Sequence, residues 1–163
     1  MSMEKTLVIM MGVQGSGKST FFADYLAEHF VRVNLDTLKT RNRERLLIEE
    51  CLSLGKSYAV DNTNPTRADR ERYIPAARAA GYRVIGYWMQ TPVETCLVRN
   101  SGREGKARVP NVAIYSTARK FEPPVYDEGF DELYTVENNS TGMTVMPMHT
   151  EQHQKQSIGM ESV

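Results

Sequence analysis

A glycine-rich run near the N-terminus, GVQGSGKST at positions 12–20, has residue types that could hold phosphate groups. It fits the spacing G-x-x-x-x-G-K-[ST], in which Lys18 is followed by Ser19. Glycines let consecutive backbone N–H groups point at a polyphosphate, and a helix that begins after the loop adds the positive end of its dipole. The pattern predicts a nucleotide-binding loop, whose contacts would come from Gly12, Gly15, Ser16, Gly17, Lys18, Ser19 and Thr20.

Lys18 and Ser19 are the two side chains of this loop that could take part in chemistry. The lysine amine can reach the β- and γ-phosphates of a nucleoside triphosphate, and the serine hydroxyl can ligate Mg²⁺. The alternative, a turn that only links a strand to a helix, leaves the Lys–Ser pair at this offset unexplained. The N-K-x-D motif with which GTPases recognise their base is absent from the sequence. We therefore expect a small kinase rather than a GTPase.

Two aspartates end apolar runs that read as strands. Asp36 follows the run 31–35 and could accept the proton of an attacking hydroxyl, or it could cap a helix. Asp61 ends the run 57–61 and could contact the water shell of Mg²⁺. Asp61 could also form a turn that supports the residues 62–65, and these two roles are compatible.

A basic run, RNSGREGKAR at 99–108, carries Arg99, Arg103, Lys106 and Arg108 against one acidic residue. Like charges four residues apart on a helix cost roughly a few tenths of a kcal/mol, unless an anion lies between them. Two glycines in the run favour a flexible loop over a stable helix. We interpret the run as an arginine-bearing lid that closes over the phosphates, and the alternative is an ordinary solvated basic loop.

These candidate residues need a scaffold, and the sequence supplies one by alternating short apolar runs with helical patterns. Strands are expected at 6–11, 31–35, 57–61, 82–90 and 130–137, and helices at 21–30, 43–55, 66–81, 92–100 and 111–121. Repeated β–α units predict an α/β fold of the P-loop NTPase type. Its parallel sheet would have helices on both faces and the ligand at the carboxyl ends of the strands.

The composition limits the class of protein and the number of domains. The chain has 163 residues, with 20 basic and 20 acidic side chains that cancel, so a protein that coats long stretches of nucleic acid is not expected. Cys51 and Cys96 lie among apolar neighbours and are expected to be buried thiols, consistent with a cytoplasmic protein. No segment approaches membrane-spanning length. Residues 1–137 are expected to form one domain, and the polar segment 138–163 to be a disordered tail.

Five segments together resemble the 5′-hydroxyl polynucleotide kinases, specifically the kinase domain of phage and animal end-repair enzymes. The segments are GVQGSGKST (12–20), VNLDTLK (33–39), AVDNTNP (59–65), RNSGREGKARVP (99–110) and IYSTARKFEPP (114–124), and the resemblance covers about residues 5–137. It implies ATP and Mg²⁺ as cofactors. It also implies a role for each matching residue: phosphate binding for Lys18, Mg²⁺ for Ser19 and Asp61, activation of the hydroxyl for Asp36, and the two lid arginines in Arg99 and Arg103.

The chain departs from the pattern of that family on the acceptor side. Lys39 stands where the phage enzymes have an arginine that contacts the acceptor's 3′-phosphate, and lysine lacks the bidentate fork of arginine. Leu35 replaces a basic residue of an N-R-D pattern. The acceptor could therefore be a 5′-hydroxyl DNA or RNA end, or a small hydroxylated metabolite, nucleoside or antibiotic. A third interpretation is a non-catalytic nucleotide-binding regulator. The oligomeric state stays open.

Overall fold

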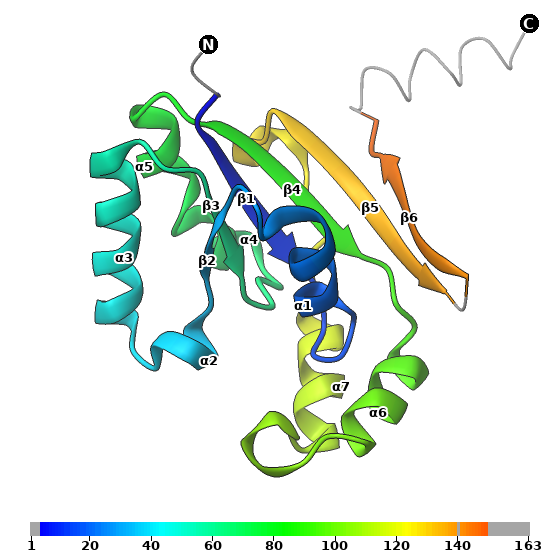
Figure 1. Ribbon diagram of the computed structural model, residues 1–163. Coiled ribbons are helices and arrows are strands. Elements are labelled where there is room, and N and C mark those ends of the chain that lie inside the picture. The colour runs from blue at the N-terminus through cyan, green and yellow to red at the C-terminus, as the bar shows by residue number, and fades with distance from the viewer. Residues whose placement is uncertain (1–3, 140, 150–163) are drawn as a thin grey trace, which may run out of the picture.

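The computed structural model describes residues 4–139 and 141–149 and is built on one six-stranded sheet (Figure 1). The strand order is β2-β3-β1-β4-β5-β6. The strands are β1 (Thr6–Met11), β2 (Val31–Val33), β3 (Tyr58–Asp61), β4 (Arg83–Met89), β5 (Glu132–Asn139) and β6 (Gly142–Pro147). The first five pair in parallel and β6 pairs antiparallel with β5, so the predicted α/β class with a parallel sheet is confirmed.

The central strand β1 is buried at every position because both faces of the sheet are covered. Leu7, Ile9 and Met11 belong to one core cluster, and Val8 and Met10 to the other, as the two-residue repeat of a strand requires. This double burial explains why the sequence shows a continuous apolar run here rather than an alternating one.

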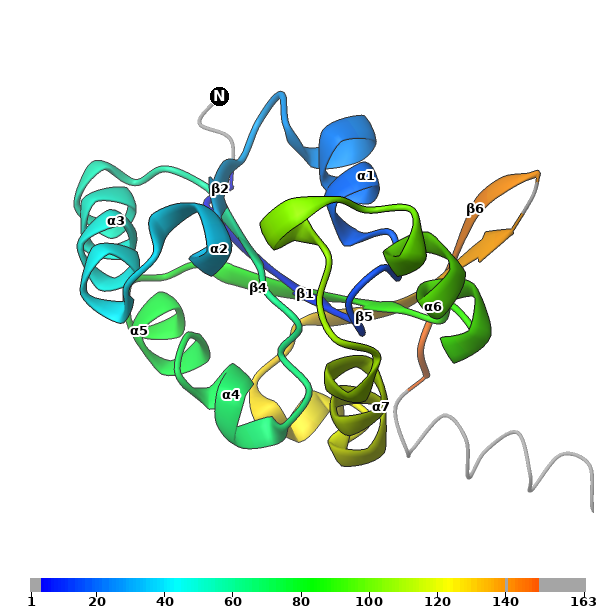
Figure 2. The same ribbon diagram turned by 90° about the horizontal axis from the view of Figure 1, so that it is seen from below.

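Helices cover both faces of the sheet. They are α1 (Lys18–Phe21), η1 (Phe22–Leu26), α2 (Leu35–Leu38), α3 (Arg41–Leu54), α4 (Arg67–Glu71), α5 (Ile74–Ala79), α6 (Val93–Ser101), η2 (Gly105–Ala107), α7 (Asn111–Lys120) and η3 (Tyr126–Glu128). Figure 2 shows α1 on one side of the sheet and α4, α5 and α7 on the other. Cys51 of α3 and Cys96 of α6 are buried and unpaired, as predicted.

The helix predicted at 66–81 is divided into α4 and α5. Thr66 caps α4 in a reciprocal capping box with Asp69. Pro75 lies in the first turn of α5, where its missing N–H costs no helical hydrogen bond. The proline therefore starts a second helix instead of continuing the first, and the prediction of one continuous helix is wrong.

The C-terminal segment also differs from the prediction. Residues 138 and 139 end β5, and 142–147 form β6, so the prediction of disorder is wrong for this part. Met143 and Met148 pack against the two core clusters. Exposed and half-buried positions alternate too weakly along β6 to give a strand pattern in the sequence. The rest of the predicted tail, 150–163, lies outside the described residues. Among the described helices, none is both long and apolar enough to cross a membrane.

Candidate active site

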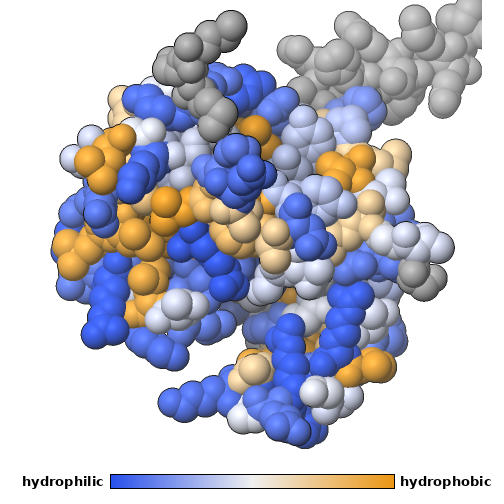
Figure 3. Space-filling model, viewed as in Figure 1, coloured by the Kyte–Doolittle hydropathy of each residue, from blue (hydrophilic) through white to orange (hydrophobic). Residues whose placement is uncertain are grey.

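A cleft of about 970 Å³ lies at the carboxyl ends of β1, β2 and β3. Its walls are the glycine-rich loop, the turn into α2, the loop after β3 and the lid between α6 and α7. Hydrophilic side chains gather on the lid, at the bottom of the view in Figure 3. Nine of the predicted site residues line the cleft: Gly15, Gly17, Lys18, Ser19, Thr20, Asp36, Lys39, Asp61 and Arg103.

Three predicted site residues do not line the cleft. Gly12 uses its backbone N–H in a hydrogen bond to the carbonyl of Thr63 (3.0 Å), and Ser16 is buried with its N–H bonded to the carbonyl of Val13 (3.0 Å). Arg99 lies behind the loop and donates to the carbonyl of Gly15 (3.1 Å). These residues shape the loop from behind.

The conformation of the loop depends on its glycines. Gly15 and Gly17 have φ angles of 82° and 102°, in the left-handed region that favours glycine. A Cβ on Gly15 would lie 2.9 Å from the carbonyl oxygen of Cys96. Lys18 folds back over the loop, and its Nζ donates to the carbonyls of Gly12 (2.9 Å) and Val13 (3.2 Å). The lysine is thus held at the rim of the loop, ready to exchange carbonyl partners for phosphate oxygens.

Burial sets the charge of Lys18. It lowers the pKa of the amine from 10.5 to about 8, against the opposing effect of Asp61, while Arg103 lowers the pKa further. An anionic ligand in the cleft would favour the charged amine and raise this pKa. The proton of Lys18 is therefore bound less tightly than that of an exposed lysine, and a phosphate in the cleft would stabilise the protonated amine.

Asp36 lies in the first turn of α2, where its side chain is exposed to the cleft. It does not cap this helix, because Asn34 is the N-cap and accepts from the N–H of Thr37 (3.1 Å). Asn62 fixes the turn by accepting from the N–H of Leu35 (2.9 Å). The carboxylate of Asp36 is thus free of a capping role and stands on a turn that two asparagines hold in place.

Asp61 is buried at the end of β3 and is bonded to an arginine that the sequence did not single out. Arg32 of β2 donates from Nε to Oδ2 of Asp61 (2.8 Å), and its Nη2 lies 2.7 Å from the same oxygen in an ion pair. The same Nη2 donates to Oγ of Ser19 (3.0 Å). The signal for Arg32 was present in the sequence as a charged residue inside an apolar strand, on the same strand face as Asn34.

The lid is partly helical and is closed at its base. Arg99 lies in α6, which ends at Ser101, and Arg103 follows the helix and reaches the cleft. Asn100, fully buried, donates to the carbonyl of Val109 (2.6 Å) and accepts from its N–H (3.0 Å). This pair of hydrogen bonds joins the two ends of the lid. Sequence reasoning missed Asn100, because its partner becomes a neighbour only in the folded chain.

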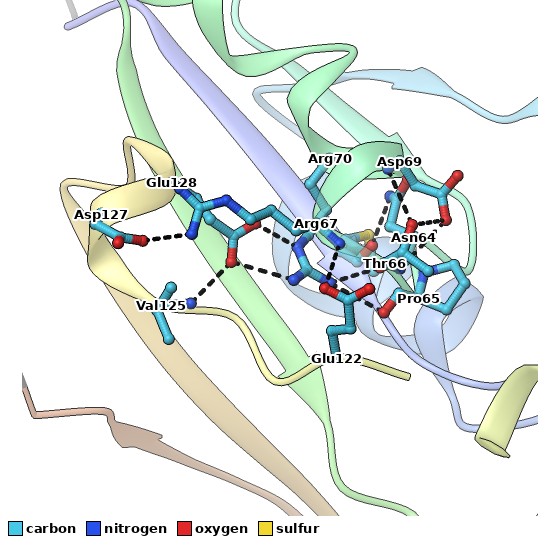
Figure 4. Close-up of polar contacts among 11 residues, drawn as sticks. Asn64, Pro65, Thr66, Arg67, Asp69, Arg70, Glu122, Val125, Asp127 and Glu128 are labelled. Atoms are coloured by element: carbon cyan, nitrogen blue, oxygen red, sulfur yellow. Dashed lines mark hydrogen bonds and ion pairs between the residues drawn. The ribbon is translucent and has the colours of Figure 1, made fainter. Parts of the chain in front are cut away.

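A buried ion pair supports the loop after β3 (Figure 4). Arg70 is fully buried and donates from Nε (2.7 Å) and Nη2 (3.1 Å) to the two carboxylate oxygens of Glu128. Its Nη1 donates to the carbonyls of Asn64 (3.0 Å) and Pro65 (3.3 Å). Because Asn64 also donates to the carbonyl of Met10 (2.9 Å), the ion pair holds this loop against the end of β1, just before the glycine-rich loop.

The side of the cleft away from the glycine-rich loop is basic. Lys39 is exposed there with a φ of 77°, an unusual backbone conformation for a residue with a side chain. Arg41 lines the same wall and donates to Glu44 (2.9 Å) and to the hydroxyl of Tyr73 (2.9 Å). Lys120 adds a further positive charge. This wall suits an acceptor that carries negative charge.

Comparisons with known proteins agree with this geometry. Residues 7–124 match the model of the AAA domain family. The chain is 36% identical over 140 residues to a putative bifunctional polynucleotide phosphatase/kinase of Acanthamoeba polyphaga mimivirus, covering 82% of this chain and 33% of that protein. It is 30% identical over 139 residues to a bifunctional polynucleotide phosphatase/kinase of Schizosaccharomyces pombe, covering 83% and 34%. The chain thus spans about a third of the length of these relatives.

A solved sugar kinase from Janibacter sp. HTCC2649 has a similar structure, with a TM-score of 0.60 at 20% identity over 82% of this chain and 85% of that one. At this identity the likeness shows the fold and leaves the substrate open. The family match covers more than half of the chain and includes the glycine-rich loop, both aspartates and the lid. The chain therefore belongs to the AAA domain family of P-loop proteins.

Proposed function

We propose that this protein is an ATP-dependent kinase that transfers the γ-phosphate to the 5′-hydroxyl end of DNA or RNA. The observation that carries the proposal is one continuous cleft in which the glycine-rich loop, Asp36 and a basic wall face a common space. The relatives named as polynucleotide phosphatase/kinases support the choice of acceptor. Because the chain spans only a third of their length, the proposal concerns the kinase step alone.

On the donor side, the backbone N–H groups of the loop and the amine of Lys18 bind the β- and γ-phosphates. Arg103, which reaches the cleft from the lid, neutralises charge on the transferring group. Arg99 contributes by holding the carbonyl of Gly15, and it could turn toward the phosphates when they bind. ATP is the donor that the resemblance implies.

Asp36 takes the proton of the acceptor. The 5′-hydroxyl oxygen attacks the γ-phosphorus as its proton passes to the carboxylate of Asp36, and the bond to the β–γ bridging oxygen breaks to release ADP. Asn34 and Asn62 support this step by fixing the turn that carries Asp36. Positioning of this kind supplies much of the catalysis in phosphoryl transfer.

Magnesium fits the chemistry of the oxygens near the loop. Nη2 of Arg32 donates to Ser19 Oγ (3.0 Å) and lies 2.7 Å from Asp61 Oδ2, so both oxygens lie beside one nitrogen, and Mg²⁺ prefers hard oxygen ligands. When bound there, Mg²⁺ would neutralise charge on the β- and γ-phosphate oxygens.

The acceptor lies along Lys39, Arg41 and Lys120. Lys39 and Lys120, together with Arg41, whose charge is partly balanced by Glu44 (2.9 Å), suit one or two phosphates of a nucleic-acid end, which agrees with a chain of zero net charge. Cys51 and Cys96, both free thiols, support a reducing compartment such as the cytoplasm for the protein.

A kinase of a small hydroxylated molecule is the second candidate. Leu35 lines the cleft where a basic residue would favour a nucleic-acid strand, and a sugar kinase shares the fold. The cleft does not favour a regulator that only binds nucleotide, because such a protein does not need a carboxylate such as Asp36 to face the glycine-rich loop.

The test is an incubation with Mg²⁺ and γ-labelled ATP in the presence of 5′-hydroxyl DNA and RNA oligonucleotides, with Lys18→Ala as the control. Label on an oligonucleotide, absent in the control, is the expected result. Binding of the oligonucleotide should weaken with salt by a slope worth only a few phosphates. If no label is transferred although ATP binds, the polynucleotide assignment is wrong, and a panel of sugars and nucleosides then tests the second candidate.

A further inference from the structure

Arg32 holds a position that the proposed reaction leaves unexplained. Its guanidinium lies between the glycine-rich loop and β3, where Nε donates to Oδ2 of Asp61 (2.8 Å) and Nη2 donates to Oγ of Ser19 (3.0 Å). Nη2 also lies 2.7 Å from Oδ2 of Asp61 in an ion pair. The carboxylate is almost fully buried, with 1% of its side chain exposed, whereas 35% of the Arg32 side chain is exposed. A permanently charged group thus bridges the two oxygens that suit a metal ion.

A guanidinium and Mg²⁺ compete for such oxygens. Arginine stays protonated at any pH that the protein meets, so its charge cannot be withdrawn by losing a proton. A divalent ion drawn to the same oxygens, at the 2.0–2.1 Å that Mg²⁺ requires, would face like-charge repulsion from the guanidinium a few ångströms away. The carboxylate Oδ2 already accepts a charged hydrogen bond from Nε and lies in ion-pair contact with Nη2, and both compete with a metal for this oxygen.

Arg32 is able to leave this position. It comes from β2, a strand of three residues, and its guanidinium lies 5.8 Å from the ring centroid of Phe22. The cleft itself is lined by Arg32, so a change of rotamer can turn the head toward solvent or toward bound phosphates while the strand stays in place.

We propose that Arg32 is a resident cation at the metal position, and that loading of Mg²⁺ with nucleotide requires Arg32 to release Ser19 and Asp61. Arg32 thereby sets the concentration of Mg²⁺ at which nucleotide binds. The inference rests on the nucleotide binding in the proposed function, and it is independent of which acceptor is phosphorylated.

The competing explanation is a purely structural ion pair between β2 and β3. In register Arg32 lies beside Ala59, so the pair does join neighbouring strands. A structural role alone predicts that loss of Arg32 weakens the protein equally with and without metal. Competition predicts instead that the loss is partly repaired by Mg²⁺, because the metal then replaces the missing charge beside Asp61.

The experiment uses Arg32→Gln in the full chain and follows binding of a fluorescent ATP analogue while Mg²⁺ is titrated, with no acceptor present. Arg83→Gln is the matched control, since Arg83 is also a strand arginine, 36% exposed, with one carboxylate partner, Glu132 at 3.2 Å. We expect the half-saturating Mg²⁺ concentration to fall by about tenfold in Arg32→Gln, the factor expected from removing one charged hydrogen-bonding competitor, and to stay unchanged in Arg83→Gln. An equal or higher Mg²⁺ requirement in Arg32→Gln would overturn the inference.

A second variant and a second readout cover the case in which Arg32→Gln folds poorly. Arg32→Lys keeps the charge but lacks the fork that reaches both oxygens. Its half-saturating Mg²⁺ concentration should therefore lie between those of Arg32→Gln and the wild type. Thermal unfolding should show a larger rise of Tm on adding Mg²⁺ and ATP in the two Arg32 variants than in the wild type, and an equal rise contradicts competition.

A shift in Mg²⁺ requirement without any labelled oligonucleotide supports Arg32 as competitor and refutes only the choice of acceptor. A wild-type protein that binds no nucleotide overturns both proposals.

Discussion

Lys18 meets two opposing demands at the rim of the glycine-rich loop. Its amine has to be charged to attract phosphate, yet burial lowers its pKa to about 8. A phosphate ligand resolves the conflict by favouring the protonated amine. Nucleotide binding is therefore linked to uptake of a proton at alkaline pH.

This linkage gives a pH dependence with a definite sign. In the free protein Lys18 loses its proton as the pH rises through about 8, whereas in the complex the raised pKa keeps it protonated. At fixed Mg²⁺, the affinity for ATP should fall as the pH rises from about 8 to 9.5, by at most tenfold per pH unit. Calorimetric titrations in two buffers of different ionisation enthalpy would measure the proton uptake. Lys18→Met should bind more weakly at every pH and show no such dependence, and a parallel decline in this variant would contradict the assignment.

Asp36 is the residue on which transfer, as opposed to binding, should depend. Asp36→Asn keeps the shape of the side chain but cannot accept the proton, so the rate of transfer should fall by about 10²- to 10⁴-fold while ATP affinity changes little. Rapid-quench measurements with a 5′-hydroxyl oligonucleotide, paired with nucleotide titrations, separate the two effects. Asp24→Asn makes the same change at an exposed position in η1 and should leave transfer intact. Full activity of Asp36→Asn would refute the general-base role.

At this scale, the sequence singled out the residues whose proposed roles depend on spacing within one segment. The glycine-rich loop and Asp36 were recognisable because each follows an apolar strand directly. The sequence marks Arg32 only as a charged residue in an apolar strand, because its partners lie 13 and 29 residues away. Asn100 carries no signal in the sequence, because a chain reversal in the lid brings its partner near. Contacts of this kind leave no periodic trace in a single sequence.

Among the elements, the loop 62–65 is the one that connects the two halves of the site. Asn62 holds the turn that carries Asp36, and Thr63 and Asn64 hold the start of the glycine-rich loop. The loop itself is held by Arg70 of α4 and Glu128 of η3, which lie on segments far apart in the sequence. The geometry of the site therefore depends on an ion pair outside the cleft.

Breaking this ion pair should destabilise the whole domain. Arg70→Met leaves Glu128 charged and buried, which costs about 3–5 kcal/mol of the free energy of unfolding. The double variant Arg70→Met/Glu128→Leu removes both charges and should be less destabilised than Arg70→Met alone, although the carbonyls of Asn64 and Pro65 still lose their donor.

Urea unfolding measures both variants. Arg67→Met is the matched control, because Arg67 pairs with Asp127 at 2.8 Å beside the same loop, but with side chains 48% and 74% exposed. This exposed pair should contribute less than about 1 kcal/mol. Equal losses at the buried and exposed pairs, or a double variant at least as unstable as Arg70→Met alone, would show that the buried ion pair does not have this role.

The elements themselves were largely predictable. All five predicted strands are present, and the helices cover both faces as the β–α repeats indicate. The break between α4 and α5 was missed because the helical spacing continues across Pro75, and a proline can begin a new helix as well as end an old one. The buried pairing of Arg70 was missed because its exposed neighbours give the segment the appearance of a solvated charged helix.

At the scale of the molecule, strand β6 closes one edge of the sheet. It covers β5 along six residues, from Tyr134 to Asn139, and brings Met143 and Met148 onto the two core clusters. Without it, β5 would present unpaired backbone groups, which favour association between chains. The segment that reads as a tail is therefore part of the folded domain up to residue 147.

Two truncations isolate the contribution of β6. A chain that ends at residue 149 and a chain that ends at residue 139 both lack 150–163, so they differ chiefly by this strand. The shorter chain should unfold at a lower temperature and form oligomers or aggregates. Differential scanning calorimetry and size-exclusion chromatography test this expectation. Identical stability and size of the two proteins would show that β6 adds nothing to the fold.

The antiparallel pairing of β5 and β6 also bears on the order of folding. In the described sheet it is the only pairing between strands joined by a short turn, since every other neighbour lies across a long crossover. Closing long loops costs chain entropy before any contact is gained, which makes parallel pairing slow. The β5–β6 hairpin can form within microseconds, before the other strands pair. The edge of β5 that does not pair with β6 can then pair with β4. A nucleus at the C-terminal end would then complete a sheet whose glycine-rich loop lies near the N-terminus, so folding would reach the site from the end of the chain farthest from it in sequence.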